Sequence, residues 1–287
     1  MNTTADARTT WDGIYAARPA ATDPRPNVRL TEAVAELPPG DALELGCGEG
    51  GDTLWLARRG WRVTAVDLSA VAVERLNDLA RLHGLADRVT AEQHDLGASF
   101  PEAPEAPDGP EASEAPEGTE GTESTEGTES TEGTESTEGT ESTESTESTE
   151  STESTESTES TESTESTNGT NGRFDLVTAH YLHTPFDLDR SAVLRRAAHA
   201  LRPGGRLLVV DHGSTAPWSW NQDPDVRFPS PREVAEGLAL DPAGWTVERA
   251  DAPRRTATGP DGTTAEVTDH VLCVRRVRRV RRTDGRA

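Results

Sequence analysis

The stretch Ala42-Leu-Glu-Leu-Gly-Cys-Gly-Glu-Gly-Gly51 decides the fold of this chain. A short apolar run, interrupted by Glu44, stops at a cluster of glycines, and the helix-like segment 52–59 follows. This order predicts a strand, a tight turn and a helix. Glycine has no Cβ, so the backbone can turn sharply here and approach a ligand closely. The backbone N–H groups at the start of the helix would face the same ligand.

The glycines also satisfy the pattern G-x-G-x-x-G, at Gly46, Gly48 and Gly51, which is typical of dinucleotide-binding domains. Asp67 ends the next apolar run, 62–67, at the distance where such a domain places the acid that binds ribose. A nicotinamide-dependent oxidoreductase is therefore one interpretation. The glycines and Asp67 alone do not separate it from other enzymes that bind a nucleoside in the same way.

Four motifs in the right order resemble class I S-adenosylmethionine-dependent methyltransferases. The segment Glu44-Leu-Gly-Cys-Gly-Glu-Gly50 resembles their first motif, which carries an acid just before the first glycine. Asp67 and Asp95 match the acids after their second and third strands. The segment Arg202-Pro-Gly-Gly-Arg206 resembles the turn that leads into their fifth strand. The resemblance implies that S-adenosyl-L-methionine is the cofactor.

Within class I, the chain is most similar to the tellurite-resistance and thiopurine methyltransferase-like group. The ending Gly244-Trp-Thr-Val-Glu-Arg249, followed by Arg255-Thr-Ala-Thr-Gly-Pro-Asp-Gly262, carries this similarity. The loop Trp218-Ser-Trp220 departs from the group's pattern, which leaves the acceptor open. The resemblance implies an enzyme that transfers a methyl group to a small-molecule acceptor. An S-adenosylmethionine-binding protein without turnover is the alternative.

The resemblance also assigns a cofactor-binding set. It implies that the glycines pack on the methionine portion, that Asp67 accepts the ribose hydroxyls, and that Asp95 with Leu96 meets the adenine. Helix capping is the alternative role for both acids. Cys47 is expected to fill the turn rather than act as a nucleophile, because methyl transfer from a sulfonium needs none. The candidate cofactor-binding residues are Glu44, Gly46, Cys47, Gly48, Gly50, Asp67, Leu68, Asp95, Leu96, Tyr15 and Asn27.

Two histidines are candidate catalytic bases. His180 ends the predicted strand 173–180, where the family presents groups to the acceptor, and His183 lies one turn further on. An acceptor that must lose a proton needs a base that works near neutral pH, and histidine suits that role. A structural or solvent-facing role is the alternative for each. The aromatic residues Trp218, Trp220 and Phe228 could wall an apolar acceptor or simply pack.

No metal is expected. Asp175, Asp211 and His212 have suitable side chains, but no metal-binding spacing stands out. Enzymes that methylate amino groups of DNA carry an Asn/Asp-Pro-Pro-aromatic motif after the fourth strand. This chain has Ala179-His-Tyr-Leu182 there, which disfavours that class.

The net charge of −24 belongs to one segment. Residues 101–172 hold 21 Glu, one Asp and no basic residue, which leaves 30 acidic residues against all 28 basic ones elsewhere. The core of this segment repeats Gly-Thr-Glu and Ser-Thr-Glu without a large apolar side chain, so it cannot bury enough surface to order itself. We expect a disordered insertion. The near-neutral remainder gives no basic excess, so we do not expect a nucleic-acid partner.

The remaining apolar runs alternate with helical patterns. This alternation predicts an α/β fold with a doubly wound, mostly parallel, Rossmann-like sheet of seven strands and an antiparallel last strand. The expected strands are 42–45, 62–66, 88–94, 173–180, 207–210, 245–249 and 265–274. The last two are expected to form a hairpin around the turn 259–262. The final strand should stop near Arg275, where a three-residue repeat of Val begins.

The predicted organisation has one folded domain with three appended parts. These are an N-terminal helical flap (1–40), a single methyltransferase domain (41–100 and 173–275), the insertion (101–172) and a basic tail (276–287). The N-terminal helix could equally be docked on the core without covering a ligand. Two cysteines are too few for a disulfide framework, and no run is long enough to span a membrane. We expect a cytoplasmic monomer.

Overall fold

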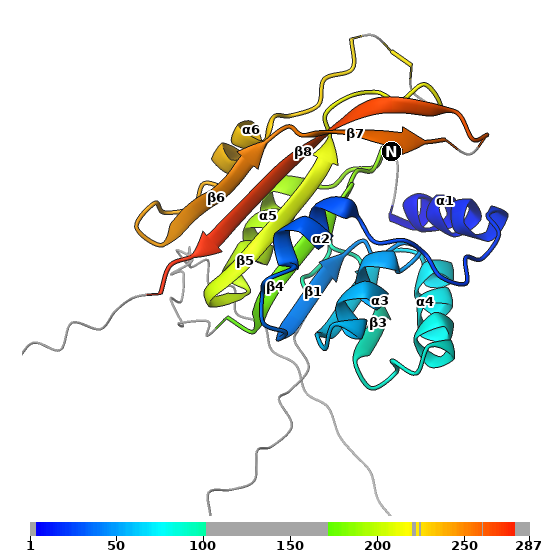
Figure 1. Cartoon of the computed structure of the whole chain (residues 1–287), viewed down its shortest axis with the longest axis horizontal. Helices are drawn as coiled ribbons and strands as arrows, with labels where there is room; N and C mark the ends of the chain where they lie inside the picture. The colour runs from blue at the N-terminus through cyan, green and yellow to red at the C-terminus, as the bar shows by residue number, and fades with distance from the viewer. Residues whose placement is uncertain (1–3, 102–171, 220–221, 224, 260, 279–287) are drawn as a thin grey trace, which may run out of the picture. The chain divides into compact units, whose positions relative to one another are not determined.

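The computed structural model describes residues 4–101, 172–219, 222–223, 225–259 and 261–278 of the 287-residue chain (Figure 1). All of them belong to one compact unit. Nearly all of the predicted insertion, most of the predicted basic tail and Trp220 lie outside the described residues. The predicted domain boundaries stay predictions.

The described residues form helices and strands in the expected alternation. The helices are α1 (Thr4–Ala17), α2 (Val28–Val34), α3 (Gly51–Arg58), α4 (Ala70–Leu82), α5 (Arg190–His199) and α6 (Pro231–Gly237). The strands are β1 (Asp41–Leu45), β2 (Arg62–Asp67), β3 (Val89–Gln93), β4 (Phe174–His180), β5 (Leu201–His212), β6 (Trp245–Asp251), β7 (Arg254–Thr258) and β8 (Thr264–Arg276). The last strand ends at Arg276, one residue beyond the predicted end.

The sheet has the order β3-β2-β1-β4-β5-β8-β6. Strands β1 to β5 pair in parallel, and β8 runs antiparallel between β5 and β6. The prediction of a mostly parallel sheet of seven strands with an antiparallel last strand is confirmed. Leu45 lies beside Val66 on one side and Ala179 on the other, so the carboxyl ends of β1, β2 and β4 meet at one edge.

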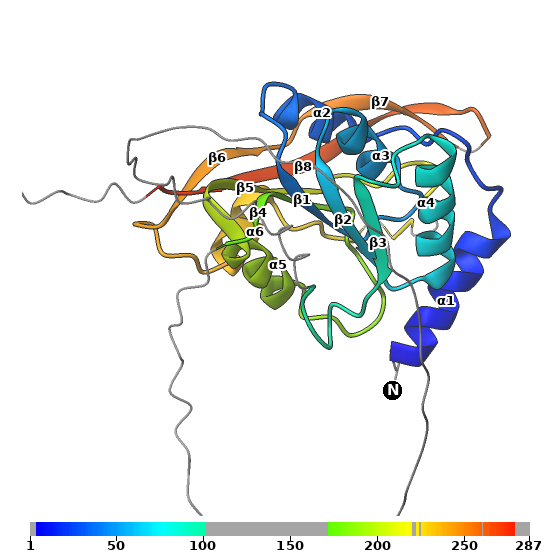
Figure 2. The same cartoon turned by 90° about the horizontal axis from the view of Figure 1, so that it is seen from below.

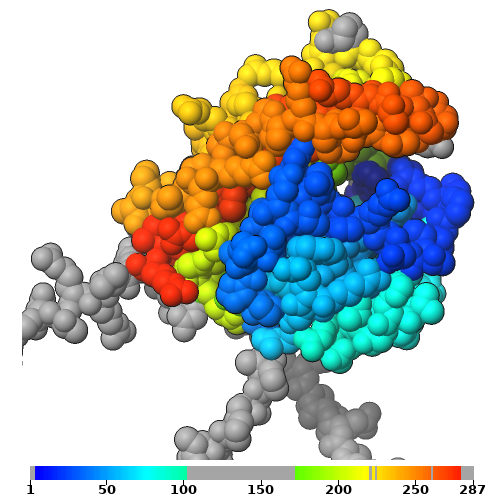
Figure 3. All heavy atoms as spheres, viewed as in Figure 1, coloured from blue at the N-terminus to red at the C-terminus, as the bar shows by residue number. Residues whose placement is uncertain are grey.

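The C-terminal hairpin differs from the prediction. The turn 259–262 joins β8 to β7, a strand that the sequence analysis did not predict, and not to β6. Strand β8 is 13 residues long, so its first part can pair with β7 while its second part pairs with β5 and β6. Strand β7 (Arg-Arg-Thr-Ala-Thr) has no apolar run because it lies outside the main sheet order. In Figure 3 this hairpin lies on the same face of the molecule as α1 and α2.

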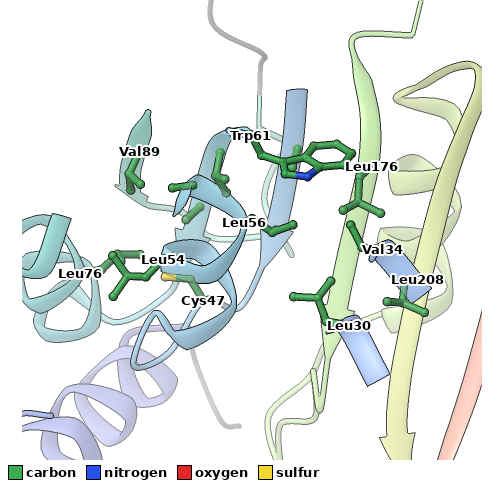
Figure 4. Packing of buried hydrophobic residues seen from close by; sticks show 14 of the residues in the cluster. Leu30, Val34, Cys47, Leu54, Leu56, Trp61, Leu76, Val89, Leu176 and Leu208 are labelled. Carbon is green, nitrogen blue, oxygen red and sulfur yellow. The ribbon is translucent and has the colours of Figure 1, made fainter. Parts of the chain in front are cut away.

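Helices cover both faces of the sheet, α2, α3 and α4 on one and α5 and α6 on the other (Figure 2). Alternate strand residues supply the two cores: Ala42 packs in the first and Leu43 in the second. This alternation is the period of two expected of strands buried on both faces. In the first core, Leu30 and Val34 of α2 face Leu176 and Leu208 of β4 and β5 (Figure 4).

Helix ends follow local sequence signals. Ser69 caps α4 by accepting the backbone N–H of Ala72, as predicted, and Asp189 caps α5 in the same way through Ala192. Among the described residues, no helix is both long enough and apolar enough to cross a membrane.

Candidate functional site

A cavity of about 1000 Å³ lies at the carboxyl ends of β1, β2 and β4. This is the edge of the sheet where open α/β proteins bind ligands. Residues of α1, the segment 24–28 and strand β7 complete its wall. In the space-filling view the surface is hollowed between α1 and the β7–β8 hairpin (Figure 3). The volume is at the upper end of the range of about 300–1,000 Å³ that is usual for small-molecule sites.

The glycine turn after β1 forms the floor of the cavity. Gly46, Gly48 and Gly50 all have positive φ angles, of 76°, 51° and 80°. Residues that carry a side chain rarely adopt a positive φ, which explains why each of these positions is a glycine. The backbone N–H groups of Gly46 and Cys47 donate to the carbonyl of Val66, so the turn is fixed on the end of β2.

Asp67, at the end of β2, also holds the glycine turn in place through hydrogen bonds. One carboxylate oxygen accepts the backbone N–H of Gly48 and the other that of Ser69, each at 2.9 Å. Burial raises the pKa of Asp67, although the two hydrogen bonds act to lower it. The carboxylate lines the cavity and keeps further acceptor positions, since each oxygen has two lone pairs.

Glu44 and Cys47 lie deeper in the wall. The Glu44 side chain accepts a hydrogen bond from the hydroxyl of Thr53 on α3. Burial, and next the negative charge of Asp52, raise the pKa of Glu44 well above its usual range. The pKa of the Cys47 thiol is also raised by burial. A buried thiol that holds its proton is a poor nucleophile, and Cys47 packs against Leu54 and Leu76 in the core (Figure 4).

Helix α1 covers one side of the glycine turn. Its Asp12 accepts the hydroxyl of Ser69 at 2.6 Å and the backbone N–H of Val71 at 3.3 Å, at the start of α4. A Cβ placed on Gly48 would lie 3.0 Å from the hydroxyl oxygen of Tyr15. Of the α1 residues only Ala7 is buried, so polar contacts hold much of this helix in place.

His180, the last residue of β4, pairs with Asp52 in the first turn of α3. The distance from its Nδ1 to Asp52 Oδ2 is 2.6 Å, and the two side chains are 6% and 11% exposed. The other oxygen of Asp52 accepts the backbone N–H of Asn27 at 2.5 Å. The His180 Nε2 atom is buried and has no hydrogen-bond partner among the described residues. Both His180 and Asp52 line the cavity.

His183 lies on the far side of the cavity, more exposed than His180. Its Nε2 is 3.2 Å from Asp211 Oδ1, and Arg190 contacts both oxygens of the same carboxylate at 2.6 and 2.8 Å. Burial acts to raise the pKa of Asp211, but the contacts with His183 and Arg190 outweigh it and lower this pKa. His183 is therefore part of an ion-pair network.

A buried polar cluster ties β7 to the rest of the wall. Asp269, 1% exposed, accepts from Arg29 Nε at 3.0 Å, Arg255 Nε at 2.9 Å and the Tyr181 hydroxyl at 3.0 Å. Burial, and next the charge of Asp269, raise the pKa of Tyr181 to about 12. Tyr181 and Arg255 line the cavity, so this cluster fixes the part of the cavity wall where β7 meets the end of β4.

A family model described as Methyltransferase domain matches residues 22–243, which are most of the chain. The chain belongs to this family. Among curated proteins, this methyltransferase is 43% identical over 51 residues to the Ribosomal RNA small subunit methyltransferase C of Alcanivorax borkumensis. That match covers 18% of this chain and only 16% of the relative's length.

Two solved structures show the same fold as the methyltransferase. One, of a protein that converts a disulfide bond into a thioacetal group during echinomycin biosynthesis, has a TM-score of 0.54 at 21% identity and covers 94% of this chain and 93% of that one. The other, TehB from Haemophilus influenzae, has a TM-score of 0.51 at 13% identity, with 87% and 62% covered. At these identities the likeness concerns the fold alone.

The methyltransferase uses S-adenosyl-L-methionine as its methyl donor. The cavity wall fits this molecule, because the turn at Gly48 leaves room for close approach, and the carboxylates of Asp67 and Asp95 suit a ligand with hydroxyl groups and a positive sulfonium. Membership in the methyltransferase family also excludes the oxidoreductase interpretation. Gly51, the third glycine of that pattern, is the first residue of α3 and packs against the carbonyl of Arg25.

The structure brings all the predicted site residues together. The eleven candidate cofactor-binding residues and both histidines line this one cavity. For two of the aromatic residues the structure favours simple packing: Trp218 lies in a smaller hollow beside Gly259, and Phe228 contacts His212. Asp95 also accepts the backbone N–H of Gly97 at 2.9 Å. The described residues contain no group of three or more His, Cys, Asp or Glu that could hold a metal ion.

The sequence analysis missed Asp52 and Arg255. Both are polar residues in segments that were assigned only a structural role, and their partners, His180 and Asp269, lie far away in the sequence. An acid in the first turn of the helix after the glycine turn was the one available signal for Asp52. Arg255 begins one of the segments that carry the family similarity, but strand β7 was not predicted, so nothing placed this side chain in the cavity wall.

Proposed function

We propose that this methyltransferase methylates a small-molecule acceptor and belongs with the tellurite-resistance and thiopurine methyltransferase-like enzymes. The observation that carries the proposal is that one cavity of about 1000 Å³ holds both the glycine turn and His180. The ending that resembles this group, from Arg255, forms β7 and contributes Arg255, Thr256, Ala257 and Thr258 to the wall. With α1 on the other side, the site suits a small acceptor better than a nucleic acid.

The proposed cofactor-binding residues have separate roles. The turn from Gly46 to Gly50 packs on the methionine portion, with Glu44 and Cys47 supporting it from below. Asp67 accepts the ribose hydroxyls, and Leu68 lies beside it. Asp95 and Leu96 meet the adenine. Tyr15 from α1 and Asn27 at the start of α2 complete the cover.

The acceptor occupies the part of the cavity lined by residues 180–188 and by β7. When bound, S-adenosyl-L-methionine supplies an already activated methyl group, so the protein mainly aligns the acceptor and excludes water. His180 is the proposed base. His183 contributes less, because Asp211 already engages its Nε2 and 38% of its side chain is exposed.

Calorimetry and an acceptor screen test this function. We expect S-adenosylmethionine and S-adenosylhomocysteine to bind the full-length chain and NADPH to show no heat of binding. Release of S-adenosylhomocysteine is then followed with a panel of small phenols, thiols and amines and, in parallel, with short RNA. Binding of NADPH alone, or methyl transfer to RNA in preference to every small molecule, would contradict the proposal.

A further inference from the structure

We propose that Asp52 and His180 act as a pair that selects acceptors which must lose a proton, a hydroxyl or a thiol group, during methyl transfer. In this pair His180 is the base, and Asp52 is a positioning residue that fixes which ring nitrogen carries the proton. The inference rests on the proposed function, because it takes methyl transfer in this cavity as given. It adds the role of Asp52 and the chemical class of the acceptor.

The contact between Asp52 and His180 determines which nitrogen of the imidazole ring carries the proton. A carboxylate can only accept, so His180 Nδ1, at 2.6 Å from Asp52 Oδ2, must carry a proton. In the neutral imidazole the other nitrogen, Nε2, then has a free lone pair. Asp52 therefore keeps His180 in the form in which Nε2 can accept a proton.

Asp52 is itself held in place from two sides. Its Oδ1 accepts the backbone N–H of Asn27, the residue that caps α2, while its Oδ2 faces His180. The carboxylate therefore cannot turn away from the ring without losing a hydrogen bond. It also links the first turn of α3, which follows the glycine turn, to the end of β4.

The buried Nε2 atom indicates where the acceptor binds. It has no partner among the described residues, and leaving a buried polar atom unsatisfied is unfavourable. In the proposed complex, an acceptor bound in the cavity that His180 lines supplies the missing partner. A lone pair at Nε2 requires a donor, and the O–H or S–H group of an acceptor can supply one.

The proposed step couples methyl transfer to the loss of a proton from the acceptor. The oxygen or sulfur of the acceptor uses a lone pair to form a bond to the methyl carbon, while the bond from that carbon to the sulfonium breaks and its electron pair stays on sulfur. The proton of the acceptor passes to His180 Nε2, and Asp52 stabilises the resulting imidazolium. The products are the methylated acceptor and S-adenosylhomocysteine, and the proton later leaves to water. An acceptor atom without a proton, such as a sulfide or a pyridine nitrogen, gains nothing from Nε2.

The first test measures directly which nitrogen of the His180 ring is protonated, and it needs no acceptor. In ¹⁵N-labelled full-length protein, long-range ¹H–¹⁵N spectra distinguish the two neutral forms of each histidine, and His180→Asn assigns the His180 signals. We expect the proton on Nδ1. In Asp52→Asn the amide can donate to Nδ1, so the proton should move to Nε2. A proton on Nε2 in the unmutated protein would overturn the inference.

The second test separates positioning from a structural role. Asp52→Asn keeps the shape of the side chain and an oxygen for Asn27, so S-adenosylmethionine affinity by calorimetry should stay within about threefold. With phenol as the probe, which keeps its proton at neutral pH, kcat should fall by about 10²–10⁴-fold, the usual effect of a general base, with little change in KM. The double variant with His180→Asn should be no slower than His180→Asn alone, because the pair acts as a unit. Additive losses would count against the pair.

Matched controls complete the design. His199→Gln, a histidine that contacts Trp245 away from the cavity, should leave the His180 signals and kcat unchanged. Thioanisole and pyridine, which carry no transferable proton, should be methylated at least 100-fold more slowly than phenol. Comparable rates for thioanisole would refute the acceptor class. Loss of S-adenosylmethionine binding in the unmutated protein would instead refute the proposed function.

Discussion

Asp67 accepts the backbone N–H of Gly48 at 2.9 Å, so the residue predicted to bind ribose also shapes the turn predicted to bind methionine. Both groups line the same cavity. The carboxylate has about four acceptor positions, and only two are used, by Gly48 and Ser69. The same side chain can therefore hold the turn and receive the cofactor hydroxyls.

Replacing Asp67 by Ala should weaken binding of S-adenosylmethionine by about 1.5–3 kcal/mol, the scale of a lost charge-assisted hydrogen bond. Calorimetry on the folded variant measures this. Asp78→Ala is the control, because Asp78 is an exposed acid on α4 that pairs only with Arg81 among the described residues. If Asp67→Ala binds as tightly as Asp78→Ala, the ribose assignment is wrong.

Gly48→Val should abolish detectable cofactor binding. The residue has a φ of 51°, and a Cβ there would lie 3.0 Å from the Tyr15 hydroxyl oxygen, in the wall of the cavity. Gly84→Val is a matched control, since Gly84 has a φ of 67° and a Cβ there would meet nothing within 4 Å. Both variants carry similar backbone strain, of about 1–2 kcal/mol, but only Gly48→Val blocks the cavity. Equal cofactor affinity in the two would contradict the glycine-turn assignment.

Glu44→Gln should stabilise the protein at pH 7 and not at pH 4. The folded-state pKa of Glu44 is raised by burial, whereas the unfolded value is about 4.3. At a pH below the unfolded-state pKa, the Glu44 carboxyl is neutral in both the folded and the unfolded protein, so its burial does not lower the stability. As the pH rises from the unfolded value to the folded value, the unfolded state ionises more readily, and each pH unit in that interval removes about 1.4 kcal/mol of stability.

Thermal unfolding of Glu44→Gln and of the unmutated protein, compared from pH 4 to pH 8, measures this dependence. The difference in melting temperature should grow with pH over this range. Glu36→Gln, an exposed residue just after α2, should show no such trend. A difference that is constant with pH would mean that Glu44 carries no buried charge penalty.

Much of the site could be predicted because its signals are local. Three glycines fix a turn, Ser69 caps a helix, and apolar runs end at Asp67 and His180. Since parallel strands end at a common edge, residues that follow different strands must meet there. That rule accounts for the predicted residues at the ends of β1 to β4, whereas Tyr15 and Asn27, which precede β1, were assigned from the family resemblance.

The parts that could not be predicted depend on contacts between distant segments. Asp52 is 128 residues from His180 in the chain, and its position in a helix is equally typical of a solvated acid. Strand β7 pairs with the first part of β8 through its backbone and through the arginines Arg254 and Arg255, so its polar sequence carries no periodic apolar signal. The choice left open for the aromatic residues was also a matter of distant contacts, because Trp218 packs beside Gly259, which lies about forty residues further along the chain.

The last prediction contrasts two acids on β8 that each pair with arginine. Asp269 is 1% exposed and accepts from Arg29 and Arg255, whereas Glu266 pairs with Arg254 in a contact whose side chains are more than 60% exposed. Removing one partner of a buried pair leaves an uncompensated charge, so Asp269→Ala should cost about 3–5 kcal/mol of unfolding free energy. Glu266→Ala should cost at most about 1 kcal/mol, because water screens an exposed pair.

Urea unfolding of both variants measures the difference between these two acids. Arg29 of α2 is only 5% exposed, and in Asp269→Ala it keeps Glu32 but loses its buried carboxylate partner. Adding Arg29→Met to Asp269→Ala should therefore recover part of the loss, although Arg255 and Tyr181 still lose their contact with the carboxylate. Similar costs for Asp269→Ala and Glu266→Ala, or no recovery with Arg29→Met, would show that this cluster does not hold β7 and α2 against the end of β4.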